Sequence, residues 1–143
     1  MNDNTITNDG SDMTAKTYRL SLGLPVDALA TRLDMTASQI LGWEREGGTA
    51  PDDAMARLGE QRAGLIDEIR SFMADEQEMR RNGESDPETG GWDFTLYRDS
   101  AGFAAADQPT HITDWRIWNQ AYLIIGLLME ALGYDITYRR TED

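Results

Sequence analysis

The stretch that most constrains the fold of this chain is LATRLDMTASQILGWERE, residues 29–46. In its middle, Asp34 is a residue that tolerates the left-handed backbone conformation of a tight turn. Thr36 and Gln39 then form a capping box, because the Thr hydroxyl can accept from the N–H of residue 39 while the Gln side chain returns to the N–H of residue 36. The stretch therefore predicts that one helix ends near Asp34 and that a second begins at Thr36.

The apolar residues on either side of this turn have helical spacing. The first helix is expected to bury Val26, Leu29, Ala30 and Leu33, and the second to bury Ile40 and Trp43. Two helices joined by so short a turn are typical of a helix-turn-helix, whose second helix lies in the major groove of DNA.

Other helices are predicted from their ends. Residues 1–13 are polar and are expected to be disordered. Thr14 is suited to cap a first helix that ends at Gly23, and Pro25 suits the first turn of the next. Asp52 and Asp53, just after a proline, open a long helix that ends near residues 80–81. Its apolar stripe could serve as a packing seam or a dimer seam: Met55, Leu58, Leu65, Ile69 and Phe72.

The C-terminal part is predicted to follow a linker or exposed loop at residues 82–91, which are rich in Gly, Pro and acidic residues. Residues 92–97 (WDFTLY) alternate and predict a short β-strand. Thr113 is expected to cap a last helix that is apolar nearly all round and therefore buried on several sides. We thus predict a helix-turn-helix domain with the long helix at residues 14–81, and a separate C-terminal segment at residues 92–143.

The net charge of −13 opposes a role on DNA, which is a polyanion. The acidity is spread along the chain: residues 1–83 hold 15 acidic and 9 basic residues, and residues 84–143 hold 11 and 4. The N-terminal part is the less acidic per residue, so it is the better candidate for contact with nucleic acid.

Composition favours a cytoplasmic protein. The sequence has no cysteine and a polar, acidic beginning without the features of a signal peptide. Its longest uncharged stretch, residues 117–129, is too short to cross a bilayer. No nucleophile–base pair, phosphate-binding glycine loop or metal-ligand spacing is present, and the acidic residues near position 86 do not match an EF-hand. We therefore predict no enzymatic activity, no cofactor, no metal site and no association with membranes.

Residues 24–46 resemble the lambda-repressor-like, or XRE-type, helix-turn-helix, including the Trp43-Glu44 pair that closes the recognition helix in many members. The segments GWEREGGTAPDDAM and LYRDSAGFAAADQPTHITDWRIWNQA extend this resemblance to the YdiL-like and anti-CRISPR-associated repressor family, over about residues 14–130. That resemblance implies a mainly α fold, in which a helix-turn-helix bundle precedes a helical dimerisation segment. It also implies a homodimeric autorepressor that binds double-stranded DNA at an inverted repeat, and some relatives are reported to bind RNA.

The resemblance carries base-facing roles to positions at the start and middle of the Thr36 helix, and phosphate contacts to nearby basic residues. The DNA-binding set that follows is Lys16, Arg19, Arg32, Thr36, Ala37, Ser38, Gln39, Gly42 and Arg45. Gln39 could read an adenine, or it could be used entirely by the capping box.

The last helix is expected to form the dimer interface together with the core. The residues assigned to dimerisation are Trp115, Trp118, Tyr122, Ile125 and Leu128. Two hypotheses remain for the whole chain. It is either a dimeric transcriptional repressor or an acidic protein-interaction module whose helix-turn-helix no longer binds DNA.

Overall fold

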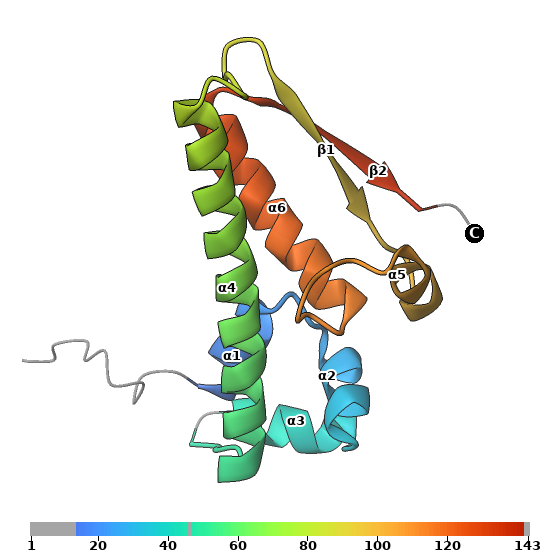
Figure 1. Cartoon of the computed structure of the whole chain (residues 1–143). Coiled ribbons are helices and arrows are strands. Elements are labelled where there is room, and N and C mark those ends of the chain that lie inside the picture. Colours follow the sequence, from blue (N-terminus) through green and yellow to red (C-terminus); the bar gives the residue numbers. More distant parts are fainter. Residues whose placement is uncertain (1–13, 46, 142–143) are drawn as a thin grey trace, which may run out of the picture. The chain divides into compact units, whose positions relative to one another are not determined.

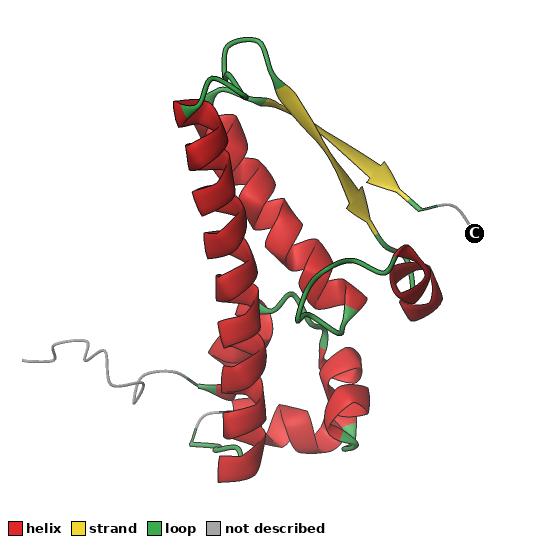
Figure 2. Cartoon of the chain, viewed as in Figure 1, coloured by secondary structure: helices red, strands yellow, loops and turns green. Residues whose placement is uncertain are grey.

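The computed structural model describes residues 14–45 and 47–141, which are mainly helical with one small parallel sheet (Figures 1 and 2). The predicted disorder of residues 1–13 lies outside the described residues. The elements in chain order are α1 (Ala15–Ser21), α2 (Val26–Leu33), α3 (Ala37–Glu44), α4 (Asp52–Arg81), β1 (Gly91–Leu96), α5 (Ser100–Ala106), α6 (Trp115–Leu132) and β2 (Asp135–Arg140).

The chain divides into two compact units, which meet within α4 between Arg62 and Ala63. Residues 82–90 form a loop that joins α4 to β1, as one of the two expectations had it, but this loop lies inside the second unit and is not the boundary that we placed there. The difference arises because the C-terminal part of α4 packs with the strands and with α6. We call residues up to Arg62 unit 1 and residues from Ala63 unit 2, and describe each by itself.

In unit 1, local signals set the ends of the short helices. The Thr14 hydroxyl accepts from the N–H of Thr17 at 3.1 Å, which confirms the predicted cap of α1. Gly23, just after α1, has a φ of 71°, a conformation that glycine adopts without strain. The chain then turns into α2, which begins after Pro25.

The turn between α2 and α3 has the predicted construction. Asp34 is left-handed, with φ 57° and ψ 48°. The Thr36 hydroxyl accepts from the N–H of Gln39 at 3.1 Å, and the N–H of Thr36 donates to Gln39 Oε1 at 2.9 Å, so the capping box is confirmed. The unit 1 core includes Leu22, Leu24, Leu29, Leu33, Ile40 and Leu58. Val26, which we expected to be buried, is half-buried.

The connection from α3 to α4 is held closely against the end of α3. The N–H of Gly48 donates to the carbonyl oxygen of Arg45 at 2.8 Å. A Cβ at Gly48 would meet the Gly42 carbonyl oxygen and would lie 2.7 Å from the carbonyl oxygen of Trp43. This close approach requires glycine, although its φ is not positive.

Unit 2 is built around a cluster of aromatic rings. Phe72 from α4 lies with its ring centroid 5.0 Å from Trp92 of β1 and 5.9 Å from Tyr122 of α6. Phe94 of β1 lies 5.2 Å from Tyr122. The Asn119 side chain, also on α6, bonds both the N–H and the carbonyl of Tyr97, each at 2.9 Å. One face of the sheet is thereby fixed to α6 and α4.

The sheet itself contains a strand that we did not predict. β1 was expected, but its partner β2 was not, and the two strands pair in parallel from Gly91↔Asp135 to Leu96↔Arg140. The short helix α5 was also missed. α6 begins after Asp114, whose carboxylate accepts from the N–H of Arg116 at 2.8 Å, so the expected cap at Thr113 was placed one residue too early.

Candidate nucleic-acid interface

The exposed surface of α3 is the candidate interface. Ala37, Ser38 and Leu41 are exposed and Gly42 is half-buried, whereas Ile40 on the opposite side is fully buried. Because residues three and four apart share a helix face, these four positions form one stripe that leads to Arg45. We call Ala37, Ser38, Leu41, Gly42 and Arg45 the α3 face. These five positions include one basic and no acidic side chain, and the exposed Asp34 lies in the turn before α3.

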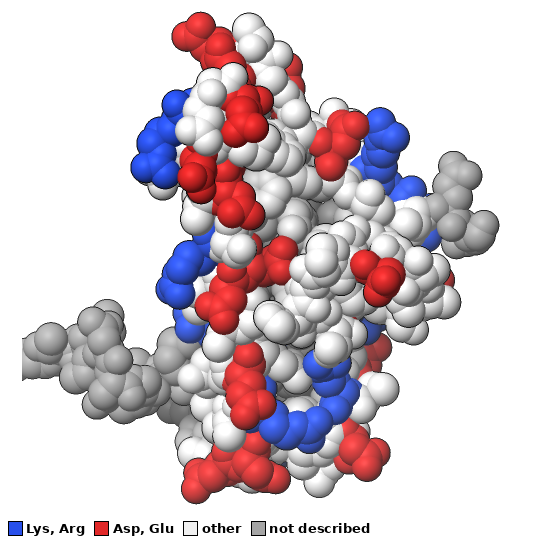
Figure 3. Space-filling model, in the orientation of Figure 1, with Lys and Arg blue, Asp and Glu red and all other residues white. Residues whose placement is uncertain are grey.

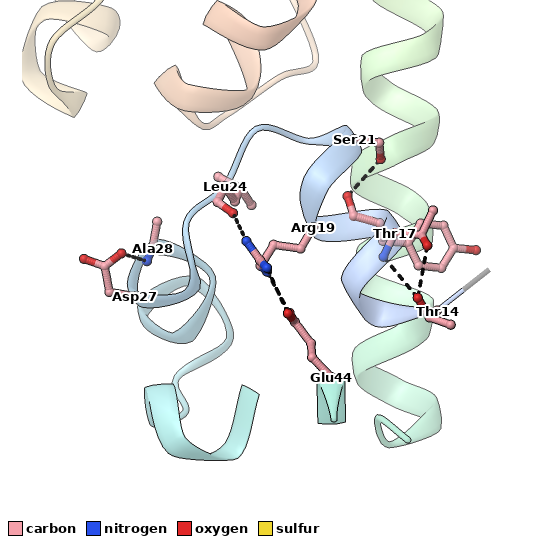
Figure 4. A network of polar contacts seen from close by, with 9 residues as sticks. Thr14, Thr17, Arg19, Ser21, Leu24, Asp27, Ala28 and Glu44 are labelled. Carbon is pink, nitrogen blue, oxygen red and sulfur yellow. Dashed lines mark hydrogen bonds and ion pairs between the residues drawn. The ribbon is translucent and has the colours of Figure 1, made fainter. Parts of the chain in front are cut away.

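Glu44, the acidic residue at the end of α3, is paired with Arg19 of α1 (Figure 4). The Arg19 guanidinium donates from Nε and Nη2 to the two Glu44 oxygens, at 2.7 and 2.8 Å. It also donates from Nη1 to the Leu24 carbonyl oxygen at 3.0 Å. The side chains of Arg19 and Glu44 are 12% and 7% exposed. The hydrogen bond to Glu44 raises the pKa of Arg19, although burial opposes this.

This pair corrects the expectation for Arg19. Arg19 was assigned to a DNA phosphate, but its three bonds are internal and its side chain is mostly covered. We therefore remove Arg19 from the phosphate-binding set. The same pair neutralises a carboxylate that would otherwise repel DNA near α3.

Gln39 belongs to the cap of α3 more than to its exposed face. Its Oε1 accepts from the N–H of Thr36 at 2.9 Å and from the Thr36 hydroxyl at 3.2 Å. Reading an adenine with both ends of the amide would need this same oxygen. The two uses that we left open are thus resolved towards capping in this structure, and Thr36 is likewise used by the cap.

The remaining basic candidates differ in their surroundings. Lys16 and Arg45 are exposed, and a Cβ at Gly42 would lie 3.1 Å from Arg45 Nη2, so the Arg45 guanidinium lies over the α3 face. Arg32 is half-buried at the end of α2. Its carbonyl oxygen accepts from Nη2 of Arg57 at 3.0 Å. Arg57 was not predicted, because it lies 25 residues further along the chain, on α4.

The charge of the chain is unevenly divided between its two units. Residues 14–62 hold 6 basic and 7 acidic residues, whereas residues 63–143 hold 7 basic and 16 acidic residues. On the side seen in Figure 3, blue groups lie between red groups in the region of α2, α3 and the start of α4. Residues 14–62 are thus nearly neutral with mixed surface charge, and most of the acidity of the chain belongs to unit 2.

Trp43 lies on the side of α3 away from the α3 face. It is half-buried and, with Thr14, Gly48 and Met55, lines an open pocket of about 240 Å³ in unit 1. This position agrees with a structural role for the ring, although we expected the side chain to be more fully buried.

The residues assigned to dimerisation are mostly part of the unit 2 core. Trp118 stacks on Tyr122 with centroids 4.3 Å apart, and both are buried, as is Ile125. The Tyr122 hydroxyl donates to Glu68 Oε2 at 2.7 Å, and burial and this carboxylate raise the pKa of Tyr122. Trp115 is half-buried, with the Arg116 guanidinium carbon 4.7 Å from its ring centroid.

Of the five assigned residues, Leu128 alone is exposed, because the other large side chains pack within their own unit. α6 was expected to be buried on several sides, and seven of its residues are buried. Part of α6 remains exposed, and Leu127 is its most exposed leucine, at 67%. The exposed leucines are spread over about half of the circumference of the helix. We call them together the leucine face: Leu123, Leu127, Leu128 and Leu132.

Within residues 14–45 and 47–141, no three acidic or histidine side chains gather in a way that could hold a metal ion. Among the described helices, none has both the length and the apolar character needed to cross a membrane. Neither a scan against models of protein families nor a search of curated proteins finds a match to this chain. The functional proposal accordingly depends on the residues and on their surroundings.

Proposed function

We propose that the protein is a dimeric, sequence-specific DNA-binding regulator of transcription, acting as a repressor in the manner of the XRE-type and YdiL-like proteins that its sequence resembles. One observation carries the proposal. In a chain with a net charge of −13, the guanidinium of the exposed Arg45 lies over the α3 face, and the carboxylate of Glu44 at the end of α3 is mostly covered and paired with Arg19. An acidic protein needs such a surface to approach a polyanion.

On DNA, the N-terminal part of α3 would lie in the major groove with the α3 face towards the bases. Ser38 is the polar side chain on this face and can bond a base edge. Arg45 and Lys16 are exposed and suited to phosphates, and Arg57 adds a cation next to the end of α2.

Two copies would bind the two half-sites of an inverted repeat, with centres about 10 base pairs apart. The leucine face of α6 is the surface that we propose for this association, because it exposes four large apolar side chains on one helix. This assignment replaces the buried residues Trp118, Tyr122 and Ile125.

The test uses the complete chain with DNA from upstream of its own coding sequence and a scrambled duplex, at two salt concentrations. Arg45→Glu should weaken binding to both duplexes at least tenfold and reduce the salt dependence, because a phosphate contact is lost. Ser38→Ala should mainly weaken binding to the upstream duplex.

Arg70→Glu is the matched control, since Arg70 is an exposed α4 residue in unit 2 and the change in charge is the same. It should have a much smaller effect than Arg45→Glu. If the wild-type protein binds neither duplex at low salt, the DNA-binding proposal fails.

A second candidate function is an acidic protein-interaction module whose α2–α3 pair no longer binds DNA. The leucine face, together with the excess of carboxylates in residues 63–143, favours this alternative. A chain that binds no DNA but retains a partner through Leu127 would support it, and loss of that partner in Leu127→Glu would locate the contact.

A further inference from the structure

The α3 face has an apolar side chain at its centre. Leu41 is 56% exposed, although it lies on a short helix whose other large apolar residues, Ile40 and Trp43, face the interior. Its neighbours on the α3 face are small or polar. Ala37 lies one turn before it and Ser38 three residues before it. Leu41 therefore protrudes between positions that leave room around it.

Helical spacing would have placed Leu41 on this face, because it follows Ala37 by four residues and Ser38 by three. It was not among the residues that we assigned to DNA. Gln39, which was, is held by the cap of α3. The side chain that α3 directs outward at the middle of its exposed face is therefore the hydrocarbon of Leu41 and not the hydrogen-bonding amide of Gln39.

A hydrocarbon directed into the major groove has one apolar partner on the base edges, which is the C5 methyl group of thymine. Cytosine, guanine and adenine present only polar atoms or ring C–H groups there. We propose that Leu41 recognises the C5 methyl of a thymine in each half-site, so that the protein requires a thymine at the base pair opposite the middle of α3. This inference depends on the proposed function, since it assumes that the α3 face contacts DNA.

The expected change in DNA affinity follows from the apolar surface that one thymine methyl group buries against Leu41. Burial of one methyl group changes an equilibrium about fourfold. Two half-sites in one duplex should thus give about 15-fold, if both copies of the protein make the contact.

The experiment compares thymine with uracil, which differs from it only by lacking the C5 methyl. The complete chain is first used to select duplexes from random-sequence DNA. The selected duplex is then prepared with uracil at each thymine in turn, in both half-sites. We expect one thymine position whose replacement weakens wild-type binding about 15-fold, while the other positions have little effect.

Leu41→Ala provides the second half of the test. It should weaken binding to the thymine duplex by a similar factor and bind the uracil duplex no more weakly than the thymine duplex. Leu20→Ala is the matched control, because Leu20 is equally exposed, at 56%, but belongs to α1 and not to the α3 face. It should keep both the wild-type affinity and the wild-type response to uracil.

The possible failures can be told apart. If no duplex is selected, the DNA-binding proposal itself fails and this inference fails with it. If a duplex is bound but no single uracil weakens binding, or if Leu41→Ala still distinguishes thymine from uracil, DNA binding stands and the role of Leu41 is overturned. The circular dichroism spectrum of Leu41→Ala should match that of the wild type, because the substitution shortens an exposed side chain and leaves the core unchanged.

Discussion

The Arg19 guanidinium donates hydrogen bonds within unit 1, to the Glu44 carboxylate and to the Leu24 carbonyl oxygen. Replacing it by Met would leave the covered Glu44 carboxylate without its partner. We expect Arg19→Met to lower the free energy of unfolding by about 3 kcal/mol, as for other buried ion pairs that lose one member. The double variant Arg19→Met, Glu44→Leu should recover much of this loss, because no unpaired charge remains. Urea denaturation followed by circular dichroism measures both.

The exposed pair Arg70–Asp67 is the comparison for this result. Its side chains are 75% and 70% exposed, so Arg70→Met should hardly change stability. If Arg19→Met were as stable as wild type but bound DNA poorly, Arg19 would be a phosphate contact after all, and our correction would be wrong.

At the scale of elements, two glycines on or beside helices should respond in opposite ways to the same substitution. Gly64 lies within α4, where an added Cβ would meet nothing within 4 Å, so Gly64→Ala should stabilise the protein by about 0.5–1 kcal/mol. At Gly48 the Cβ would meet backbone carbonyls at the end of α3, so Gly48→Ala should cost about 1–3 kcal/mol. The shift in the urea midpoint gives the sign of each change. Equal signs would contradict the close packing of Gly48 against α3.

The elements that could be predicted from the sequence are those set by residues close together in the chain. The caps at Thr14 and Thr36 and the turn at Asp34 each depend on fewer than five residues. The β1–β2 pair joins residues that are 44 positions apart in the sequence, such as Gly91 and Asp135. No residue near either strand indicates which segment it pairs with. The ion pair between Arg19 and Glu44 could not be predicted for the same reason, because the two residues are 25 positions apart.

The candidate interface shows a different limit. Apolar residues on a helix have the same spacing in the sequence whether they pack within their own chain or against another copy. Trp118 and Leu128 were therefore assigned to one interface, although Trp118 is buried and Leu128 is exposed. Spacing does identify residues that share a face, and Leu41 follows Ala37 by four residues on the exposed face of α3.

For the whole molecule, the leucine face makes a prediction about assembly. Leu127→Glu places a charge at the most exposed leucine of α6 and should weaken self-association about 100-fold, or about 3 kcal/mol, while leaving the fold intact. Light scattering over a range of concentrations should then report a monomer. DNA affinity should fall as well, because a single copy can bind only one half-site.

Two variants complete this test. Leu20→Glu introduces the same charge at an exposed leucine of unit 1 and should leave the oligomeric state unchanged. Trp118→Asp should reduce helical content, because its ring stacks on Tyr122 in the core. A Leu127→Glu protein that remained a dimer would move the interface to another surface.

The parallel pairing of β1 with β2 also has a consequence for the kinetics of folding. Parallel strands cannot be joined by a tight turn, and here the connection contains both α5 and α6. Unit 1, by contrast, is assembled from contacts between neighbouring short helices. Because distant pairings close slowly, we expect unit 1 to fold first and the strands to join late. Until they do, Phe72, Phe94 and Tyr122 lack part of their cover, which makes the incomplete unit 2 the species most prone to aggregate.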